Sequence, residues 1–132
     1  MTRYLLDTGV VIRHLRGQPA VVAWLRCLAV QGRLGIASVT RSEIHAGLHP
    51  LEAEPTQKLL NRLVTYHLSP TIADLAGDYI REYQAKRINL SPHSAIIAAT
   101  AITCQLTVVT LKLNDFPMPG ITLCPLPARW ED

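Results

Sequence analysis

Three of the ten acidic side chains in this 132-residue chain stand where short, apolar, strand-like segments end. Asp7 closes the first such segment, Glu43 lies in the first turn after the second, and Asp115 follows a later one. Because ligands of a parallel sheet bind beyond the carboxyl ends of its strands, we expect these carboxyl groups to cluster within roughly 10 Å. Clustered carboxylates need a cation, and hard oxygen ligands suit Mg²⁺ or Mn²⁺. Such an ion activates water for hydrolysis of a phosphodiester. The alternative for each acid taken alone is a purely structural role as a helix cap.

The segments that would position these acids alternate between strand and helix patterns. Apolar and β-branched runs predict strands at residues 3–8, 34–40, 66–70, 107–111 and 120–126. Helical patterns cover residues 10–17, 19–31, 41–48, 54–64, 71–87 and 95–101. Strands that alternate with helices favour a parallel sheet covered on both faces. We therefore expect one α/β domain over residues 1–132.

Composition and charge restrict the class of protein. A hydrophobic content of 48% with 17% charged residues indicates a globular chain, and a net charge of +3 permits a nucleic-acid partner without requiring one. The three cysteines have no metal-ligand spacing, which is typical of buried thiols in a reducing compartment. Asp7 interrupts the apolar run at the start of the chain, so we expect neither a signal peptide nor a membrane span, and a cytoplasmic location.

No other motif offers a stronger site. The sequence contains no GxGxxG, P-loop or GxSxG pattern. His45 and His49 have the spacing of a zinc pair but lack the glutamate of HExxH, so we interpret them as polar-face residues. Asp74, Asp78 and Glu82 recur every four residues and predict a solvated helix face.

The segment LSPHSAIIAATA, which starts at Leu90, predicts a buried helix with polar groups only at its beginning. We expect Ser94 either to cap this helix or to make a weak, water-mediated contact with the site. We expect His93 to be a surface or capping residue, because one step along a helix turns a side chain by roughly 100°.

Four segments resemble, in order and spacing, the motifs of PIN-domain proteins, and most of all those of VapC-type toxins from toxin–antitoxin pairs. They are LLDTGVVI, SVTRSEIHAGL, SAIIAATA and VVTLKLNDF. The resemblance implies a three-layer α/β/α sandwich with a central parallel sheet. It also implies an endoribonuclease dependent on Mg²⁺ or Mn²⁺, a homodimer, and a cognate antitoxin as inhibitor.

The family's catalytic and metal-binding acids carry over onto Asp7, Glu43 and Asp115. The third aspartate of the family usually stands just before the small apolar run, and this chain has Ser94 there. Gly9 and Lys112 also stand where the family usually has polar, uncharged side chains. These departures predict weak metal binding and impaired cleavage.

Two functions of different class stay open. In the first, a ribonuclease, Thr8, Thr110 and Lys112 neighbour the acids in the pocket, and phosphate contacts come from Arg13, Arg16 and Arg41. In the second, a non-catalytic PIN-like module binds RNA or an antitoxin without turnover. Metal-dependent RNA cleavage by the purified protein separates the two. The apolar segments 21–30 and 59–64 offer more hydrophobic face than a small domain needs, which favours a two-fold dimer.

Overall fold

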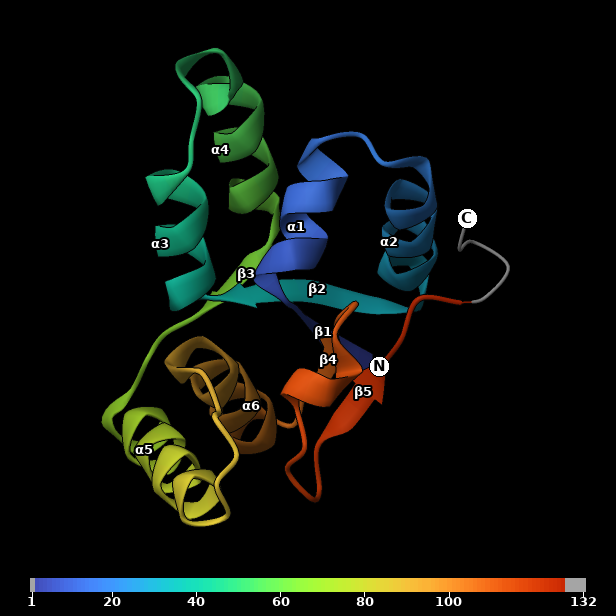
Figure 1. Cartoon of the computed structure of the whole chain (residues 1–132). Coiled ribbons are helices and arrows are strands. Elements are labelled where there is room, and N and C mark those ends of the chain that lie inside the picture. Colours follow the sequence, from blue (N-terminus) through green and yellow to red (C-terminus); the bar gives the residue numbers. More distant parts are fainter. Residues whose placement is uncertain (1, 128–132) are drawn as a thin grey trace.

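A single parallel sheet organises the computed structural model, which describes residues 2–127. Its strands lie in the order β3-β2-β1-β4-β5, with β1 at the centre, and every neighbouring pair is parallel (Figure 1). Their bounds are Thr2–Leu6 (β1), Gly32–Ala37 (β2), Val64–Tyr66 (β3), Thr107–Val109 (β4) and Thr122–Cys124 (β5).

Helices cover both faces of this sheet, so the expected three-layer α/β/α sandwich is confirmed (Figure 1). One face carries α1 (Thr8–Leu15), α2 (Pro19–Gln31), α3 (Ser38–Ala46) and α4 (Ala53–Arg62). The other carries α5 (Pro70–Ala85) and α6 (Pro92–Cys104). Two short 3-10 helices, η1 (Pro50–Glu52) and η2 (Leu113–Asp115), lie in connections. Within the described residues, no helix is long and apolar enough to cross a membrane.

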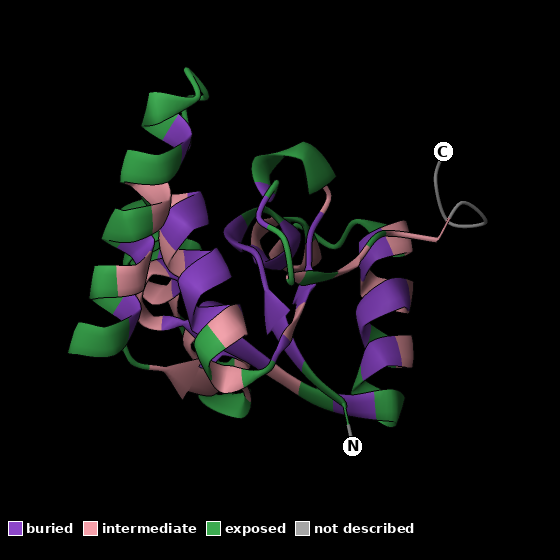
Figure 2. Cartoon of the chain, turned by 90° about the horizontal axis from the view of Figure 1, so that it is seen from below, coloured by how far each residue is buried: buried purple, intermediate pink, exposed green. Residues whose placement is uncertain are grey.

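The central strand divides its side chains between two cores because successive strand residues point to opposite faces. Leu5 packs into the core under α5 and α6, whereas Tyr4 and Leu6 pack under α1 to α4. The strands at the centre are therefore largely buried, and exposed residues gather on outward helix sides and in connections (Figure 2). This two-sided burial holds β1 rigidly, and Asp7 follows directly at its end.

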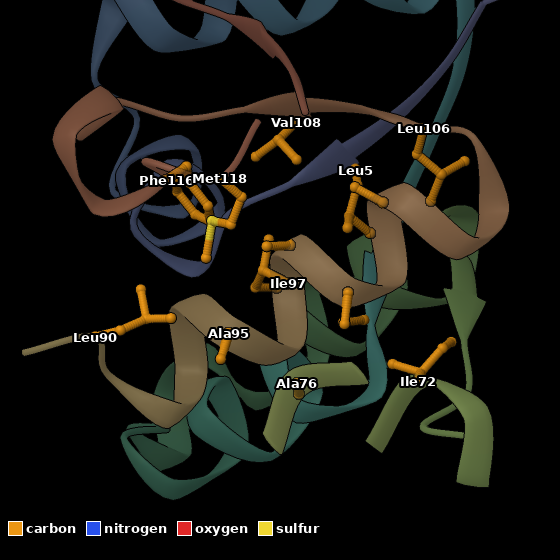
Figure 3. Close-up of a cluster of buried hydrophobic side chains, with 14 of the residues drawn as sticks. Leu5, Ile72, Ala76, Leu90, Ala95, Ile97, Leu106, Val108, Phe116 and Met118 are labelled. Atoms are coloured by element: carbon orange, nitrogen blue, oxygen red, sulfur yellow. The ribbon is translucent and has the colours of Figure 1, made fainter. Parts of the chain in front are cut away.

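Helix α6 is the buried helix that its composition predicts, but it begins earlier than expected, at Pro92. Ile97 is fully buried and lies between the sheet residues Leu5 and Val108 and helix α5 (Figure 3). The Ser91 hydroxyl accepts the Ser94 N–H, so Ser91 is the N-cap and the expectation that Ser94 caps the helix is wrong. Pro92 then fits the first helical position, where an N–H is not needed.

Two strand predictions also need correction. The strand expected at 66–70 lies at Val64–Tyr66, because Ser69 caps α5 and Pro70 opens it. The strand expected at 34–40 ends at Ala37, and the next three residues form the first turn of α3. Ending β2 there places Glu43 in the second turn of a helix that rises from the carboxyl edge of the sheet.

The strand order fixes where a ligand can bind. The chain leaves β1 towards β2 on one side, whereas β4 lies on the other side of β1. In such sheets the crevice for ligands opens beyond the carboxyl ends of the two strands where the order reverses. Here those strands are β1 and β4, which are followed by Asp7 and Thr110.

Candidate active site

Asp7 is the centre of the polar cluster at this edge. Its side chain is 12% exposed, and its Oδ1 caps α1 by accepting the N–H of Thr8 at 2.8 Å. Its Oδ2 accepts the hydroxyl of Thr110, the residue after β4, at 2.9 Å. Its backbone N–H donates to the carbonyl of Val109 at 3.0 Å. These contacts from two adjacent strands hold the carboxylate in one orientation.

His93 joins this cluster, and the expectation that it is a surface or capping residue is wrong. Its Nε2 lies 2.8 Å from Asp7 Oδ1, and its Nδ1 lies 2.5 Å from Glu43 Oε1. The Nδ1 contact is short but misaligned for a hydrogen bond, so this buried nitrogen has no hydrogen-bond partner. The imidazole thus stands against two carboxylates from distant parts of the chain.

Glu43 is the second acid in contact with the ring. Its Oε1 lies 3.0 Å from the Thr8 hydroxyl, which is also 3.0 Å from the hydroxyl of the fully buried Thr40. Thr8 and His93 therefore connect Glu43 to Asp7 from both sides. This linkage explains why β1, α3 and α6 have to meet at the same edge of the sheet.

A cavity of about 280 Å³ opens beside Asp7. Asp115, in η2, lines the same cavity as Asp7 and His93. Three basic residues also line it, namely Arg13, Arg16 and Lys112. Glu43 does not, because it lies behind the His93 ring. The cavity therefore combines two carboxylates, one imidazole and a basic rim.

Two residues singled out in the sequence lie apart from this cavity. Ser94 is almost completely buried, and its hydroxyl accepts that of Ser91 at 3.0 Å. Arg41 donates to the Leu60 carbonyl at 3.3 Å and to the Thr65 hydroxyl at 3.1 Å. The guanidinium of Arg41 thus ties α3 to α4 and β3, and the structure does not bring it to the site.

The two ionisable partners at the centre shift each other's pKa. Burial raises the pKa of Asp7, but the hydrogen bonds from His93, Thr110 and Thr8 and the charge of His93 outweigh it and lower that pKa. The hydrogen bond to Asp7 raises the pKa of His93, and burial opposes this only in part. The folded protein therefore favours the pair of an aspartate and an imidazolium.

This pairing predicts a pH-dependent stability of the metal-free protein. The contribution of His93 is complete below its ordinary pKa of 6.5 and is lost as pH rises through the raised value. The contribution of Asp7 is present above 3.8 and is lost as pH falls through the lowered value. In EDTA, the difference in unfolding temperature between parent and His93→Gln should be largest near about pH 5.5 and shrink towards about pH 9. A pH-independent difference would contradict the pairing.

The donor set suits a divalent cation. Asp7, Asp115 and His93 line the cavity, so two carboxylates and one imidazole are available to an ion. In the ring, Nε2 contacts Asp7 and Nδ1 is buried without a hydrogen-bond partner. Within residues 2–127, no three His, Cys, Asp or Glu side chains already surround one point as metal ligands do. The ring of His93 therefore has to turn before an ion can bind beside Asp7.

The family model of the PIN domain matches residues 4–113, a span from β1 to η2 that includes Asp7, Glu43 and His93. The chain belongs to the PIN-domain family. Ribonuclease VapC10 from Mycobacterium tuberculosis (strain ATCC 25618 / H37Rv) is 33% identical to this PIN-domain protein over 114 residues, which cover 86% of each chain.

Solved structures of toxin–antitoxin complexes have the same fold. VapBC2 from Rickettsia felis, bound to a DNA fragment from its promoter, contains a chain with a TM-score of 0.84 and 20% identity, covering 96% of this chain and 100% of that chain. A toxin–antitoxin complex from Klebsiella pneumoniae gives a TM-score of 0.75 at 26% identity, covering 90% and 95%. The protein is thus a PIN-domain protein of the VapC type.

Proposed function

We propose that this PIN-domain protein is a divalent-metal-dependent endoribonuclease, the toxin of a toxin–antitoxin pair. The observation that carries the proposal is the cavity at the β1/β4 edge, which Asp7 and Asp115 line together with three basic residues. Carboxylates suit the metal and the basic side chains suit a phosphodiester.

The side chains of the cavity have distinct roles in this proposal. When bound, the cation polarises the phosphodiester and lowers the pKa of the attacking water. Asp7 is the main residue that holds it, Asp115 either binds it or orients the water, and Glu43, which does not line the cavity, acts through its contact with His93. Thr110 and the Thr8 N–H fix the Asp7 carboxylate in the orientation that this task needs.

The basic rim binds the substrate backbone. Arg13, Arg16 and Lys112 are exposed and line the cavity. No acidic side chain in the described part of the chain forms a salt bridge with any of the three. Such basic side chains lie next to the two carboxylates. They can position a phosphate of the RNA backbone without recognising the base sequence.

The test is cleavage of total RNA by the purified protein, with Mg²⁺, Mn²⁺ or EDTA. Fragments that form only with a metal support the proposal. Retention of intact RNA in a binding assay, without cleavage in any metal, would instead favour the non-catalytic module. Ser94 in place of the family's third aspartate is the observation that keeps this second function open.

Ser94 does not line the cavity, but an aspartate at this position has a longer side chain that can turn from Ser91 towards the cavity. We therefore expect the Ser94→Asp variant to bind Mg²⁺ about 10²-fold more tightly than the parent. At an effective dielectric of about 20 and a distance of about 4 Å, one added carboxylate attracts a divalent cation by roughly 8 kcal/mol before desolvation. Desolvation cancels much of this, which leaves about 2–4 kcal/mol. Isothermal titration measures the change, and Thr71→Asp, an exposed acid in the first turn of α5, is the control. Equal affinities of parent and Ser94→Asp would remove position 94 from the metal site.

A second feature suits an antitoxin partner. An apolar groove of about 580 Å³ lies between α1, α2, β2 and α4, with Leu25, Leu59 and Leu63 among its lining residues. Exposed arginines at positions 26, 33 and 62 also line it. We assign this groove to an amphipathic segment of the antitoxin, whose apolar side fills the groove and whose acidic side chains meet the arginines.

We expect the Leu59→Glu variant to bind the cognate antitoxin about 10²-fold more weakly, because a carboxylate would be buried against apolar side chains. Leu51→Glu is the matched control, since Leu51 is 86% exposed in η1 and does not line the groove. Surface plasmon resonance with immobilised antitoxin gives both affinities. Equal losses in the two variants would place the antitoxin elsewhere. The homodimer implied by the resemblance stays a prediction.

A further inference from the structure

The position of His93 has a consequence for the choice of metal. His93 lines the cavity together with Asp7 and Asp115, whereas Glu43 does not. The ring therefore separates Glu43 from the space in which an ion would meet the other two acids. The imidazole of His93 therefore lies between Glu43 and the space in which an ion would bind.

We propose that His93 is a ligand of the metal ion through Nε2, and that this site selects transition ions such as Mn²⁺, Co²⁺ or Zn²⁺ over Mg²⁺. The proposal rests on the proposed function and specifies the class of its cofactor. It concerns binding of the ion itself, so it can be tested in the absence of RNA.

The spacing of the donors supports this assignment. Neighbouring ligands of an octahedral ion with bonds of about 2.1 Å lie about 3.0 Å apart. His93 Nε2 and Asp7 Oδ1 are 2.8 Å apart in a direct hydrogen bond, so an ion that replaces the shared proton needs the ring to rotate but needs little change in the separation of the two atoms. Because Thr8 and Thr110 fix the Asp7 carboxylate, the aspartate stays in place while the ring turns slightly to admit the ion.

Glu43 is placed to orient the ring. A histidine that binds a metal through one nitrogen usually donates its other N–H to a carboxylate. His93 Nδ1 is buried, and Glu43 Oε1 lies 2.5 Å from it. Glu43 is in turn held by the hydroxyl of Thr8 at 3.0 Å. The Nδ1 contact is misaligned in the present ring orientation, so the turn of the ring that admits an ion also has to bring the Nδ1–H into line with Glu43, while the ion replaces the Nε2 proton that Asp7 now accepts.

The preference for a transition ion follows from the donor types. Mg²⁺ takes oxygen ligands almost exclusively, whereas imidazole suits Mn²⁺, Co²⁺ and Zn²⁺ increasingly well. The cavity is lined by two carboxylates and one imidazole, and Ser94 adds no oxygen donor to it. A nitrogen donor in such a set weakens the site for Mg²⁺ more than for a transition ion.

The experiment measures Mn²⁺ and Mg²⁺ affinities by calorimetry in the full-length protein without RNA. It compares the parent, His93→Ala, His93→Asp and, as the control, His67→Ala, which alters an exposed histidine outside the cavity. We expect His93→Ala to lose about 10- to 100-fold in Mn²⁺ affinity. His93→Asp, which restores an all-oxygen set, should reduce the preference for Mn²⁺ over Mg²⁺ about tenfold. His67→Ala should match the parent.

A spectroscopic measurement identifies the ligand directly. Pulsed electron paramagnetic resonance of bound Mn²⁺ should show coupling to a ¹⁴N nucleus in the parent and in His67→Ala, and none in His93→Ala. Unchanged or tighter Mn²⁺ binding by His93→Ala, or a nitrogen coupling that survives in it, would overturn the proposal. Tight Mn²⁺ binding with nitrogen coupling but no RNA cleavage would instead contradict the proposed function and leave the ligand assignment standing.

Discussion

We expect Asp7→Asn to reduce metal-dependent RNA cleavage by about 10²–10³-fold, which corresponds to about 3–4 kcal/mol of transition-state stabilisation. The substitution removes the charge at the point where β1 and β4 both fix the carboxylate. It also replaces the charged partner of His93 by a neutral amide. Cleavage of total RNA with Mn²⁺, compared at equal protein concentration, measures the loss.

Asp7→Asn separates loss of charge from loss of fold. Asparagine caps a helix about as well as aspartate, so the side chain can still accept the Thr8 N–H. The control is Asp74→Asn, which removes one exposed carboxylate from α5 without touching the cavity. Cleavage that falls equally in both variants, or in neither, would show that Asp7 does not hold the catalytic ion.

The placement of Asp7 could be predicted from the sequence because it depends on a local rule. Asp7 closes an apolar run, and an α/β alternation predicts parallel strands whose carboxyl ends share an edge. Thr110 was expected beside it from the resemblance, within a strand at 107–111 that in fact ends at Val109. The structure confirms this rule, since Thr110 donates to Asp7 from the adjacent strand. The alternation of strands and helices, together with the identity of the residue at the end of the strand, was sufficient to place Asp7 at this edge of the sheet.

His93 was interpreted as a surface or capping residue because it lies one step, or roughly 100°, from position 94, where the resemblance places the site. The start of its helix was also placed too late. Ser91 followed by Pro92 is a local sign of an N-cap and a first helical residue. The same sign at Ser69 and Pro70 opens α5, at the position where a strand was expected. Both errors come from giving hydrophobic periodicity more weight than a serine–proline pair. With α6 starting at Pro92, His93 lies one residue into the first turn, and its side chain reaches Asp7.

Other features depend on contacts between distant segments and have no local signal. Arg41 sits beside Glu43 in sequence, yet its guanidinium turns to the Leu60 carbonyl and the Thr65 hydroxyl. The direction of the Arg41 side chain depends on hydrogen-bond acceptors on α4 and β3. The sequence around Arg41 does not indicate where those acceptors lie. The separation of Glu43 from the cavity by His93 is likewise a packing result.

The second large effect concerns the strand that carries Asp7. We expect Gly32→Ala to lower the free energy of unfolding by about 3 kcal/mol, because the added methyl group would overlap backbone. Gly32 is the residue of β2 that pairs with Thr2 of β1. A Cβ built on it would lie 2.9 Å from Tyr4 Cε2 and 2.8 Å from the carbonyl carbon of Thr2, with the oxygen closer still.

The effect of Gly32→Ala is steric and not conformational. The φ of Gly32 is −168°, an extended value open to any residue, so only the contact with β1 opposes a side chain. Gly77→Ala, in α5, is the matched control, since no atom lies within 4 Å of its added Cβ. In a helix interior this exchange should raise the free energy of unfolding by about 0.5–1 kcal/mol. Urea unfolding of both variants gives changes of opposite sign. A Gly32→Ala protein as stable as the parent would mean that β1 can shift away from β2, and Asp7 would then lack the rigid support that the active site requires.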